Sequence, residues 1–156
     1  RVAELAKAFG MKIVAYDPYV DREVASKRGV KLVDNLSDLL RVSDYVSIHT
    51  PLTDETYRMI GEEELKIMKP TAFLVNTARG AVVDERALAK ALKNGWIAGA
   101  ALDVFEDEPL KNSDLIKLDN VILTPHIGGN TLEAQKSIAR ILAEKIVDYI
   151  ESYHEV

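Results

Sequence analysis

Three kinds of side chain in this sequence could take part in chemistry, and each follows a short apolar run. Arg79 follows the run 72–76, and its planar guanidinium can bind a carboxylate through two parallel hydrogen bonds and polarise a neighbouring ketone oxygen. The acidic stretch 106–108 and the lone His126 come later in the chain. A histidine can exchange a proton near neutral pH, although a lone one often has a structural role, and an exposed arginine often forms a surface salt bridge. The residue types alone leave these alternatives open and do not choose among the three acids.

The elements that must position these side chains alternate between apolar strands and amphipathic helices. We expect strands at 11–16, 30–33, 45–49, 72–76, 97–104 and 120–124. We expect helices at 1–9, 20–28, 37–40, 62–68, 84–93 and from 131 toward the C-terminus, with Ser37 and Asp84 as N-caps. Continuous apolar strands are typical of a parallel sheet covered on both faces. The pattern predicts a doubly wound α/β fold, whose ligands bind beyond the carboxyl ends of the strands.

Composition narrows the class of protein. The chain has 156 residues, of which 47% are hydrophobic and 29% charged, and its 20 basic and 25 acidic residues give a net charge of −5. This balance, without a basic stripe, argues against nucleic acid, and no apolar run reaches the roughly 18 residues of a membrane span. The absence of cysteine excludes disulfides, thiolate nucleophiles and cysteine-bound metals. We expect a cytoplasmic protein with no metal site and no nucleic-acid or membrane partner.

Four segments at the strand ends resemble the D-isomer-specific 2-hydroxyacid dehydrogenases. They are VAYDPY at 14–19, HTPLT at 49–53, VNTARGAVVDERAL at 75–88 with GAALDVFEDEPL at 99–110, and NVILTPHIGGNTLEAQ at 120–135. The resemblance covers essentially the whole chain, and PHIGGNTLEAQ looks most like the D-3-phosphoglycerate dehydrogenase branch. It implies a Rossmann-like domain that binds NAD.

The resemblance also implies which residues are catalytic. Glu108 would accept a hydrogen bond from one ring nitrogen of His126, fix its tautomer and favour its protonated form. His126 would carry the proton to or from the substrate oxygen while hydride moves between substrate C2 and the nicotinamide. Arg79 would bind the substrate carboxylate.

The cofactor residues follow from the same resemblance. Asp17 would accept hydrogen bonds from the adenosine ribose hydroxyls and repel a 2′-phosphate, which favours NAD over NADP. Its alternative role is that of a turn residue before Pro18. Asp103 matches a position beside the nicotinamide, and Thr77 and Ala78 would offer backbone groups to the same ring. The remaining cofactor residues that the resemblance implies are His49, Thr50, Pro51, Arg79, His126, Gly128 and Gly129. For His49, packing at the strand end is an equal alternative.

The resemblance implies oxidation of 3-phosphoglycerate to 3-phosphohydroxypyruvate, the entry to serine biosynthesis. A glyoxylate or hydroxypyruvate reductase and a D-lactate dehydrogenase are alternatives within the family. A non-catalytic, dinucleotide-sensing domain, as in the related corepressors, is an alternative outside enzymes. A small 2-hydroxy or 2-oxo acid is the expected partner, and the intact protein is expected to be a homodimer or a higher homo-oligomer.

One departure from the family pattern sets an expectation for the fold. In the family, the helix that matches residues 1–9 follows a strand and a G-x-G-x-x-G turn, which holds the dinucleotide pyrophosphate. Neither is found in this sequence, nor is the preceding substrate domain. We expect residues 1–127 to form an incomplete NAD-binding domain with a gap in the centre of its sheet. Residues 128–156 are expected to form a helix that leads back toward the substrate domain, and the 156 residues alone to bind NAD weakly and be inactive.

Overall fold

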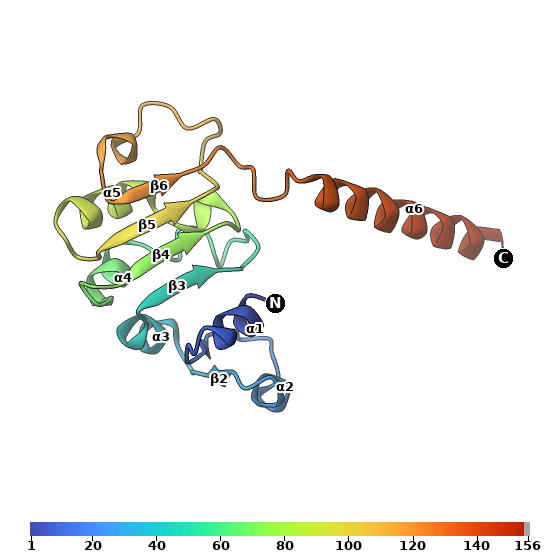
Figure 1. The fold of residues 1–156 in the computed structure, drawn as a ribbon, viewed down its shortest axis with the longest axis horizontal. Helices are drawn as coiled ribbons and strands as arrows, with labels where there is room; N and C mark the ends of the chain where they lie inside the picture. Colours follow the sequence, from blue (N-terminus) through green and yellow to red (C-terminus); the bar gives the residue numbers. More distant parts are fainter. Residues whose placement is uncertain (155–156) are drawn as a thin grey trace.

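The computed structural model describes residues 1–154 and arranges them as a parallel α/β fold (Figure 1). In chain order the elements are α1 (Val2–Ala8), β1 (Val14–Ala15), α2 (Arg22–Lys27), β2 (Lys31–Leu32), α3 (Leu36–Val42), β3 (Tyr45–Ile48), α4 (Glu62–Ile67), β4 (Phe73–Asn76), the 3-10 helix η1 (Gly80–Val82), α5 (Glu85–Lys93), β5 (Gly99–Leu102), the 3-10 helix η2 (Asp114–Lys117), β6 (Val121–Leu123) and α6 (Leu132–His154). Each predicted helix and strand is present, often shorter than predicted. The two 3-10 helices were not predicted.

The strands form two separate parallel sheets. β3, β4, β5 and β6 pair in that order, with Tyr45 beside Phe73 and Phe73 beside Gly99, whereas β1 pairs only with β2. Within residues 1–154 no strand joins β1 to β3. The interruption falls at the place where a central strand is expected to be absent.

The core lies on one face of the larger sheet. The buried row of strand residues Val46 and Leu74 faces helices α3, α4 and α5, whose Leu40, Leu65 and Leu88 are fully buried. Parallel pairing of apolar strands against these helices therefore produces the α/β layering that the sequence predicts.

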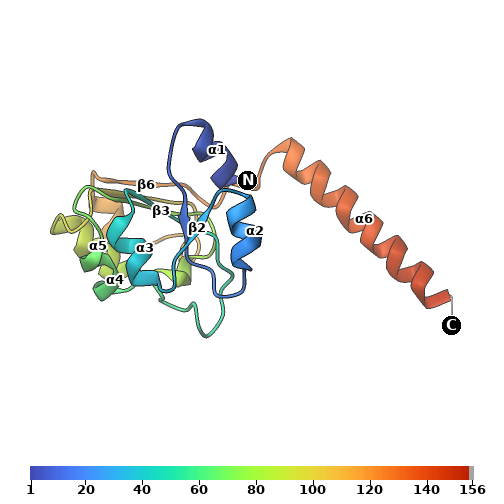
Figure 2. The ribbon, with the colours of Figure 1, turned by 90° about the horizontal axis from the view of Figure 1, so that it is seen from below.

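The opposite face of β3–β6 is largely uncovered, which differs from the expectation of helices on both faces. Tyr45 and Phe73 stack there with ring centroids 5.6 Å apart, and both are exposed, as is Ile122. α1 has no buried residue, and α6 extends away from the sheet in both views (Figures 1 and 2). The apolar runs are as predicted, but no helix of the described chain packs on their second face.

α6 is the longest helix, with 23 residues, and its described side chains from Gln135 onward are exposed. Its apolar positions, among them Ile138 and Ile150, therefore have no partner surface in the described chain. None of the described helices, α6 included, combines the length and the hydropathy needed to cross a membrane.

Helix capping in α3 differs in detail from the prediction. Asn35, rather than Ser37, is the N-cap, and its side-chain oxygen accepts the N–H of Asp38 at 2.9 Å. Ser37 lies within the first turn, where its hydroxyl cannot serve the orphan N–H groups in this way. At α5 the predicted cap is confirmed, because Asp84 accepts the N–H groups of Arg86 and Ala87.

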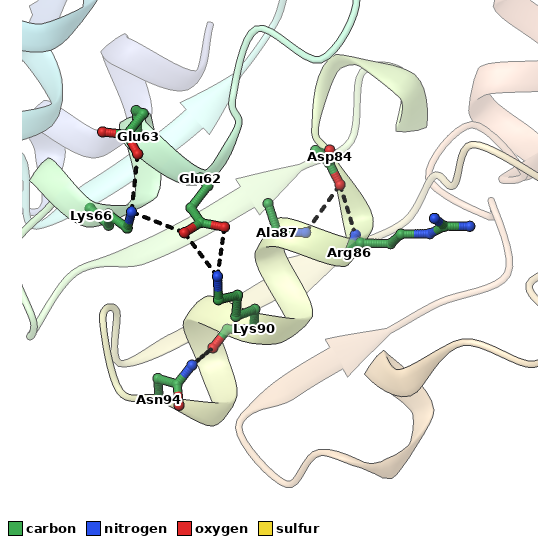
Figure 3. A network of polar contacts seen from close by, with 8 residues as sticks. All are labelled: Glu62, Glu63, Lys66, Asp84, Arg86, Ala87, Lys90 and Asn94. Carbon is green, nitrogen blue, oxygen red and sulfur yellow. Dashed lines mark hydrogen bonds and ion pairs between the residues drawn. The ribbon is translucent and has the colours of Figure 1, made fainter.

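A polar network joins α4 to α5 (Figure 3). Glu62 binds Lys66 at 2.9 Å and Lys90 at 2.8 Å, and both ammonium groups lie 5.4 Å from the centre of the Trp96 ring. Hydrogen bonds from Lys90 and Lys66 lower the pKa of Glu62. The network links the two helices at the surface, above the apolar contacts that hold them on the sheet.

Leu74 and Ile122 test which face of the sheet carries the core. Leu74→Ala should lower the free energy of unfolding by about 2–5 kcal/mol, because it leaves a cavity in a fully buried site. Ile122→Ala on the uncovered face, where Ile122 is 68% exposed, should cost less than about 1 kcal/mol. Urea denaturation followed by circular dichroism measures both, and equal losses would contradict a one-sided core.

Candidate active site

The parallel strands bring the predicted site residues to one edge of the sheet. All arrows from β3 to β6 point the same way in Figure 1, so the segments that follow them emerge side by side. His49 follows β3, Arg79 follows β4, Asp103 follows β5 and His126 follows β6. Asp17 follows β1 in the smaller sheet.

Glu108 is the acid that contacts His126. Glu108 Oε2 lies 2.7 Å from His126 Nδ1, and Glu108 Oε1 accepts the N–H of Phe105 at 3.0 Å. The hydrogen bond with His126, followed by that from Phe105, lowers the pKa of Glu108. An ionised carboxylate can only accept, so Nδ1 carries the hydrogen and Nε2 of His126 is left to exchange a proton with another molecule.

Asp103 holds the turn that presents His126. It is a buried charged residue, 7% exposed, and it accepts hydrogen bonds from Thr124 Oγ1 at 2.5 Å, Ile127 N at 2.9 Å and Gly128 N at 2.8 Å. His126 itself has a φ of 54°, in the left-handed region that a non-glycine residue enters only when its surroundings hold it there. These contacts were not predicted. They give Asp103 a part in fixing His126, besides the place beside the nicotinamide that the resemblance implies.

Gly128 and Gly129 differ in what surrounds them. A Cβ on Gly128 would lie 2.9 Å from Asp103 Oδ2, so the missing side chain allows the Asp103 carboxylate to reach the backbone of this turn. A Cβ on Gly129 would have nothing within 4 Å. Close packing therefore explains Gly128 without a cofactor, and it does not explain Gly129.

Arg79 is exposed, and within residues 1–154 it forms no ion pair; its one side-chain contact is with the carbonyl of Ala78 at 2.6 Å. The surface salt bridge that the sequence left open is not found in this part of the chain. Asn76, which is 1% exposed, shapes the loop: it donates to the Arg79 carbonyl at 2.9 Å and accepts the N–H of Ala78 at 3.0 Å. Asn76 was missed in the sequence, although a polar residue that ends an apolar strand was a usable signal.

The loop of Arg79 packs directly on the loop of Glu108. A Cβ on Gly80 would lie 1.9 Å from the carbonyl carbon of Phe105 and 2.4 Å from the nitrogen of Glu106. Only glycine fits such a close backbone approach. The proposed carboxylate-binding arginine and the acid–histidine pair thus stand on two loops in mutual contact.

A cavity of about 550 Å³ adjoins the pair. Glu108 and His126 line part of it, and apolar side chains line most of the rest, including Phe105, Leu110 and Ile116. Neither lysine nor arginine is among its lining residues. The pocket therefore combines the acid–base pair of Glu108 and His126 with a largely apolar lining.

The residues predicted to face the cofactor offer several unused polar atoms. Thr50 Oγ1 is shielded from solvent and has no hydrogen-bond partner in the described chain. Asp17 accepts the N–H of Tyr19 at 2.9 Å through one oxygen, and no contact from residues 1–154 reaches the other. His49 is exposed, and its Nε2 lies 2.9 Å from Ser47 Oγ. Thr50 and Asp17 fit a ligand that carries hydroxyl groups.

Three further predicted cofactor residues lie in the same loops. Pro51 and Thr77 are exposed, and the Pro51 carbonyl accepts a hydrogen bond from Thr56 Oγ1 at 2.7 Å. The N–H of Ala78 is already used by Asn76. Of the expected backbone donors, that of Ala78 is therefore engaged within the loop itself.

Comparison with known proteins identifies the family of the chain. Residues 1–128 match the family model described as the D-isomer specific 2-hydroxyacid dehydrogenase, NAD binding domain. The chain belongs to this family. Its fold is the Rossmann-like parallel sheet that the sequence predicts, and the cofactor of the family is NAD.

Two curated relatives illustrate the family. The chain is 54% identical over 148 residues to the glyoxylate reductase of Thermococcus litoralis, covering 95% of this chain and 44% of the relative. It is 52% identical over 146 residues to the D-3-phosphoglycerate dehydrogenase of Methanocaldococcus jannaschii, covering 94% of this chain and 28% of the relative. The chain therefore spans less than half the length of these relatives.

Solved structures show the same fold. The NAD complex of a D-isomer specific 2-hydroxyacid dehydrogenase from Lactobacillus delbrueckii ssp. bulgaricus matches with a TM-score of 0.84 and 36% identity, over 97% of this chain and 49% of that one. A glyoxylate reductase from Paecilomyes thermophila matches with a TM-score of 0.88 and 39% identity, over 96% of this chain and 45% of that one.

Asp103 predicts an acid-sensitive part of the stability. The hydrogen bond from Thr124, with those from Ile127 and Gly128, lowers its pKa in the folded chain, so the carboxylate stabilises the fold above the ordinary aspartate pKa. That contribution is lost as the pH falls through the lowered, folded-state pKa. Asp103→Asn should reduce the free energy of unfolding at pH 7, and the difference from wild type should shrink as the pH falls below about 4, the ordinary aspartate pKa.

Urea titrations at several pH values measure this difference. The same substitution at exposed Asp119 is the control and should change little at any pH. A difference between wild type and Asp103→Asn that stays constant down to pH 2 would contradict a role for the Asp103 charge.

Proposed function

We propose that this chain is the NAD-binding and catalytic part of a D-2-hydroxyacid dehydrogenase. The observation that carries the proposal is the 2.7 Å contact between Glu108 and His126, at a cavity and on the sheet edge that also carries Arg79. The reaction of a 2-hydroxy acid requires two groups: a guanidinium that binds the carboxylate and a histidine that exchanges the hydroxyl proton.

Each residue has a separate task in this proposal. Arg79 binds the substrate carboxylate, and it is exposed and unpaired within residues 1–154, so it is available to do so. His126 exchanges a proton with the substrate oxygen through Nε2, since Nδ1 is bound to Glu108. Glu108 accepts the hydrogen of Nδ1 and so fixes the tautomer of His126. NAD, when bound, accepts or delivers the hydride at substrate C2.

The cofactor residues remain those proposed from the sequence. Asp17 binds the ribose hydroxyls, and the unpartnered Thr50 hydroxyl supports a polar ligand next to β3. The other cofactor residues proposed are His49, Pro51, Thr77, Ala78, Arg79, Asp103, His126, Gly128 and Gly129. We also propose that the pyrophosphate is held by a glycine-rich turn of a longer polypeptide, since β1 and β3 each lack a strand partner on one side and the relatives are more than twice as long.

The domain organisation belongs to the same proposal. Residues 1–127 form the NAD-binding domain, and 128–156 connect it to a substrate domain, which the exposed apolar positions of α6 support. A cytoplasmic location and a homodimer or higher homo-oligomer stay predictions for the full-length protein.

Two substrates are proposed within the family. The motif PHIGGNTLEAQ favours 3-phosphoglycerate and hence a place in serine biosynthesis, and one relative at 52% identity is a D-3-phosphoglycerate dehydrogenase. The 54% identical relative is a glyoxylate reductase, and the cavity beside His126 has no cationic side chain to bind a phosphate. Rates of the full-length protein with 3-phosphoglycerate, glyoxylate, hydroxypyruvate and D-lactate distinguish the candidates. No reaction with any 2-hydroxy or 2-oxo acid would favour the dinucleotide-sensing alternative.

His126 tests the reaction class. In the full-length protein, His126→Gln should lower turnover by roughly 10²- to 10⁴-fold, because a glutamine amide does not gain or lose a proton near neutral pH. NAD affinity should change little. Steady-state kinetics and NAD titration measure the two effects, and wild-type turnover in the variant would contradict the assignment.

NAD binding by the isolated chain tests the two-part sheet. The 156 residues alone should bind NAD weakly, since residues 1–154 contain neither a strand between β1 and β3 nor a glycine-rich pyrophosphate turn that leads into α1. Isothermal titration calorimetry measures the affinity. A micromolar dissociation constant would show that the described residues suffice.

A further inference from the structure

The segment that carries Glu108 has no regular structure of its own. Residues 103–110 form neither helix nor strand, and yet Glu108 must reach His126 at hydrogen-bond distance. Its position must therefore be set by side-chain and backbone contacts with neighbouring elements.

Glu106 is bound to neighbouring elements through both its side chain and its backbone. Its two carboxylate oxygens both lie 3.1 Å from Arg58 Nη2, and Tyr57 donates its hydroxyl to Glu106 Oε1 at 3.1 Å. Its backbone N–H donates to Glu85 Oε1 at 2.6 Å. Glu106 is thus fixed by both its side chain and its backbone, from two different parts of the fold.

Arg58 is itself rigidly placed. Its N–H donates to the carbonyl of Ala81 at 2.8 Å, in the loop that follows Arg79, and its φ of 49° lies in the left-handed region. Its guanidinium lies 5.2 Å from the centre of the Tyr57 ring and 3.9 Å from an Asp84 oxygen. The side chains of Arg58 and Glu106 are 42% and 30% exposed, so the pair is less accessible than an ordinary surface ion pair.

Glu106 is connected to Glu108 through Phe105. The N–H of Phe105 donates to Glu108 Oε1, and the backbone of Phe105 and Glu106 rests on Gly80. If Glu106 moves, the donor that orients Glu108 moves with it, and Glu108 Oε2 no longer meets His126 at the same distance.

We propose that Arg58 and Glu106 are positioning residues for the Glu108–His126 pair. The proposal rests on the proposed function and adds two residues that neither hydrogen-bond to the pair nor line its cavity. It also gives different roles to two of the three neighbouring acids: Glu108 supports the histidine, and Glu106 anchors the loop. The charged groups that face Glu106 are Arg58 and Glu85, with Asp84 beside Arg58 and Asp107 next in the chain.

The substitution Arg58→Met tests the proposal, since it keeps the length of the side chain and removes its charge and donors. Carbon-13 NMR titration of the Glu108 carboxyl in the 156-residue chain measures the contact directly. The pKa of Glu108 should rise toward the ordinary glutamate value, because the bond with His126 that lowers it is weakened. The nitrogen-15 shifts of the His126 ring should show a reduced preference for hydrogen on Nδ1.

The variants Arg58→Lys and Glu106→Gln complete the series. Arg58→Lys keeps one charged donor and should restore part of the wild-type titration. Arg58→Met combined with Glu106→Gln should do no more than the larger single change, since both remove one interaction. In the full-length protein Arg58→Met should lower kcat roughly 10- to 100-fold, the effect of a small misplacement, with a smaller change in KM.

Lys69→Met is the matched control. Lys69 forms a partly exposed ion pair with Asp44 at 2.8 Å, and both residues precede strands, at the opposite edge of the sheet from His126. This variant should leave the Glu108 titration and kcat unchanged. If circular dichroism shows that Arg58→Met does not fold, the Glu108 titration in Glu106→Gln takes its place as the test.

An unchanged Glu108 titration in folded Arg58→Met or Glu106→Gln would overturn the positioning role. The titration does not depend on catalysis, so it decides this proposal even if the full-length protein has no dehydrogenase activity. Absence of activity in the wild type would instead contradict the proposed function.

Discussion

The in-register parallel pairing of β3 to β6 is the constraint on which the candidate site depends. The carboxyl ends of parallel strands lie at the same edge of the sheet. The segments after β4, β5 and β6 therefore begin side by side, although they are distant in the sequence. The buried rows that include Leu74 fix this register, because a shift by one residue would place them on the uncovered face. The chemistry at the edge is therefore set by packing in the core.

Within that edge, the loops are held by charged and polar side chains rather than by regular structure. Asp103 accepts hydrogen bonds from the turn of His126, and Asn76 donates one within the loop of Arg79. Glu106 accepts hydrogen bonds from Arg58 and so holds the segment of Glu108. Each of these side chains has several partners of its own. An ionised group with several donors holds a loop more firmly than one hydrogen bond, since each bond restrains a different direction of movement.

Local charge, not net charge, decides what the site can bind. The chain carries a net charge of −5, yet Arg79 is exposed at the active edge and unpaired among residues 1–154. Nearby acids are already engaged, Glu106 by Arg58 and Glu108 by His126, so neither is available to neutralise Arg79. The proposed carboxylate substrate would therefore meet a cation that has no ion-pair partner among residues 1–154, in a protein of net negative charge.

The sequence alone determined the order of strands and helices, the α/β class, and Arg79, Glu108 and His126 as candidates. Apolar periodicity and strand-end motifs are local signals, so they can be recognised without knowledge of the fold. The roles of Arg58, Gly80 and Glu106 came only from the tertiary structure. Those roles depend on contacts between segments far apart in the chain, such as Arg58 with Glu106, and no pattern of residue types along one strand or helix encodes them. The uncovered face of the sheet also became visible only in the tertiary structure, because an apolar strand shows that it can be buried but not which element covers it.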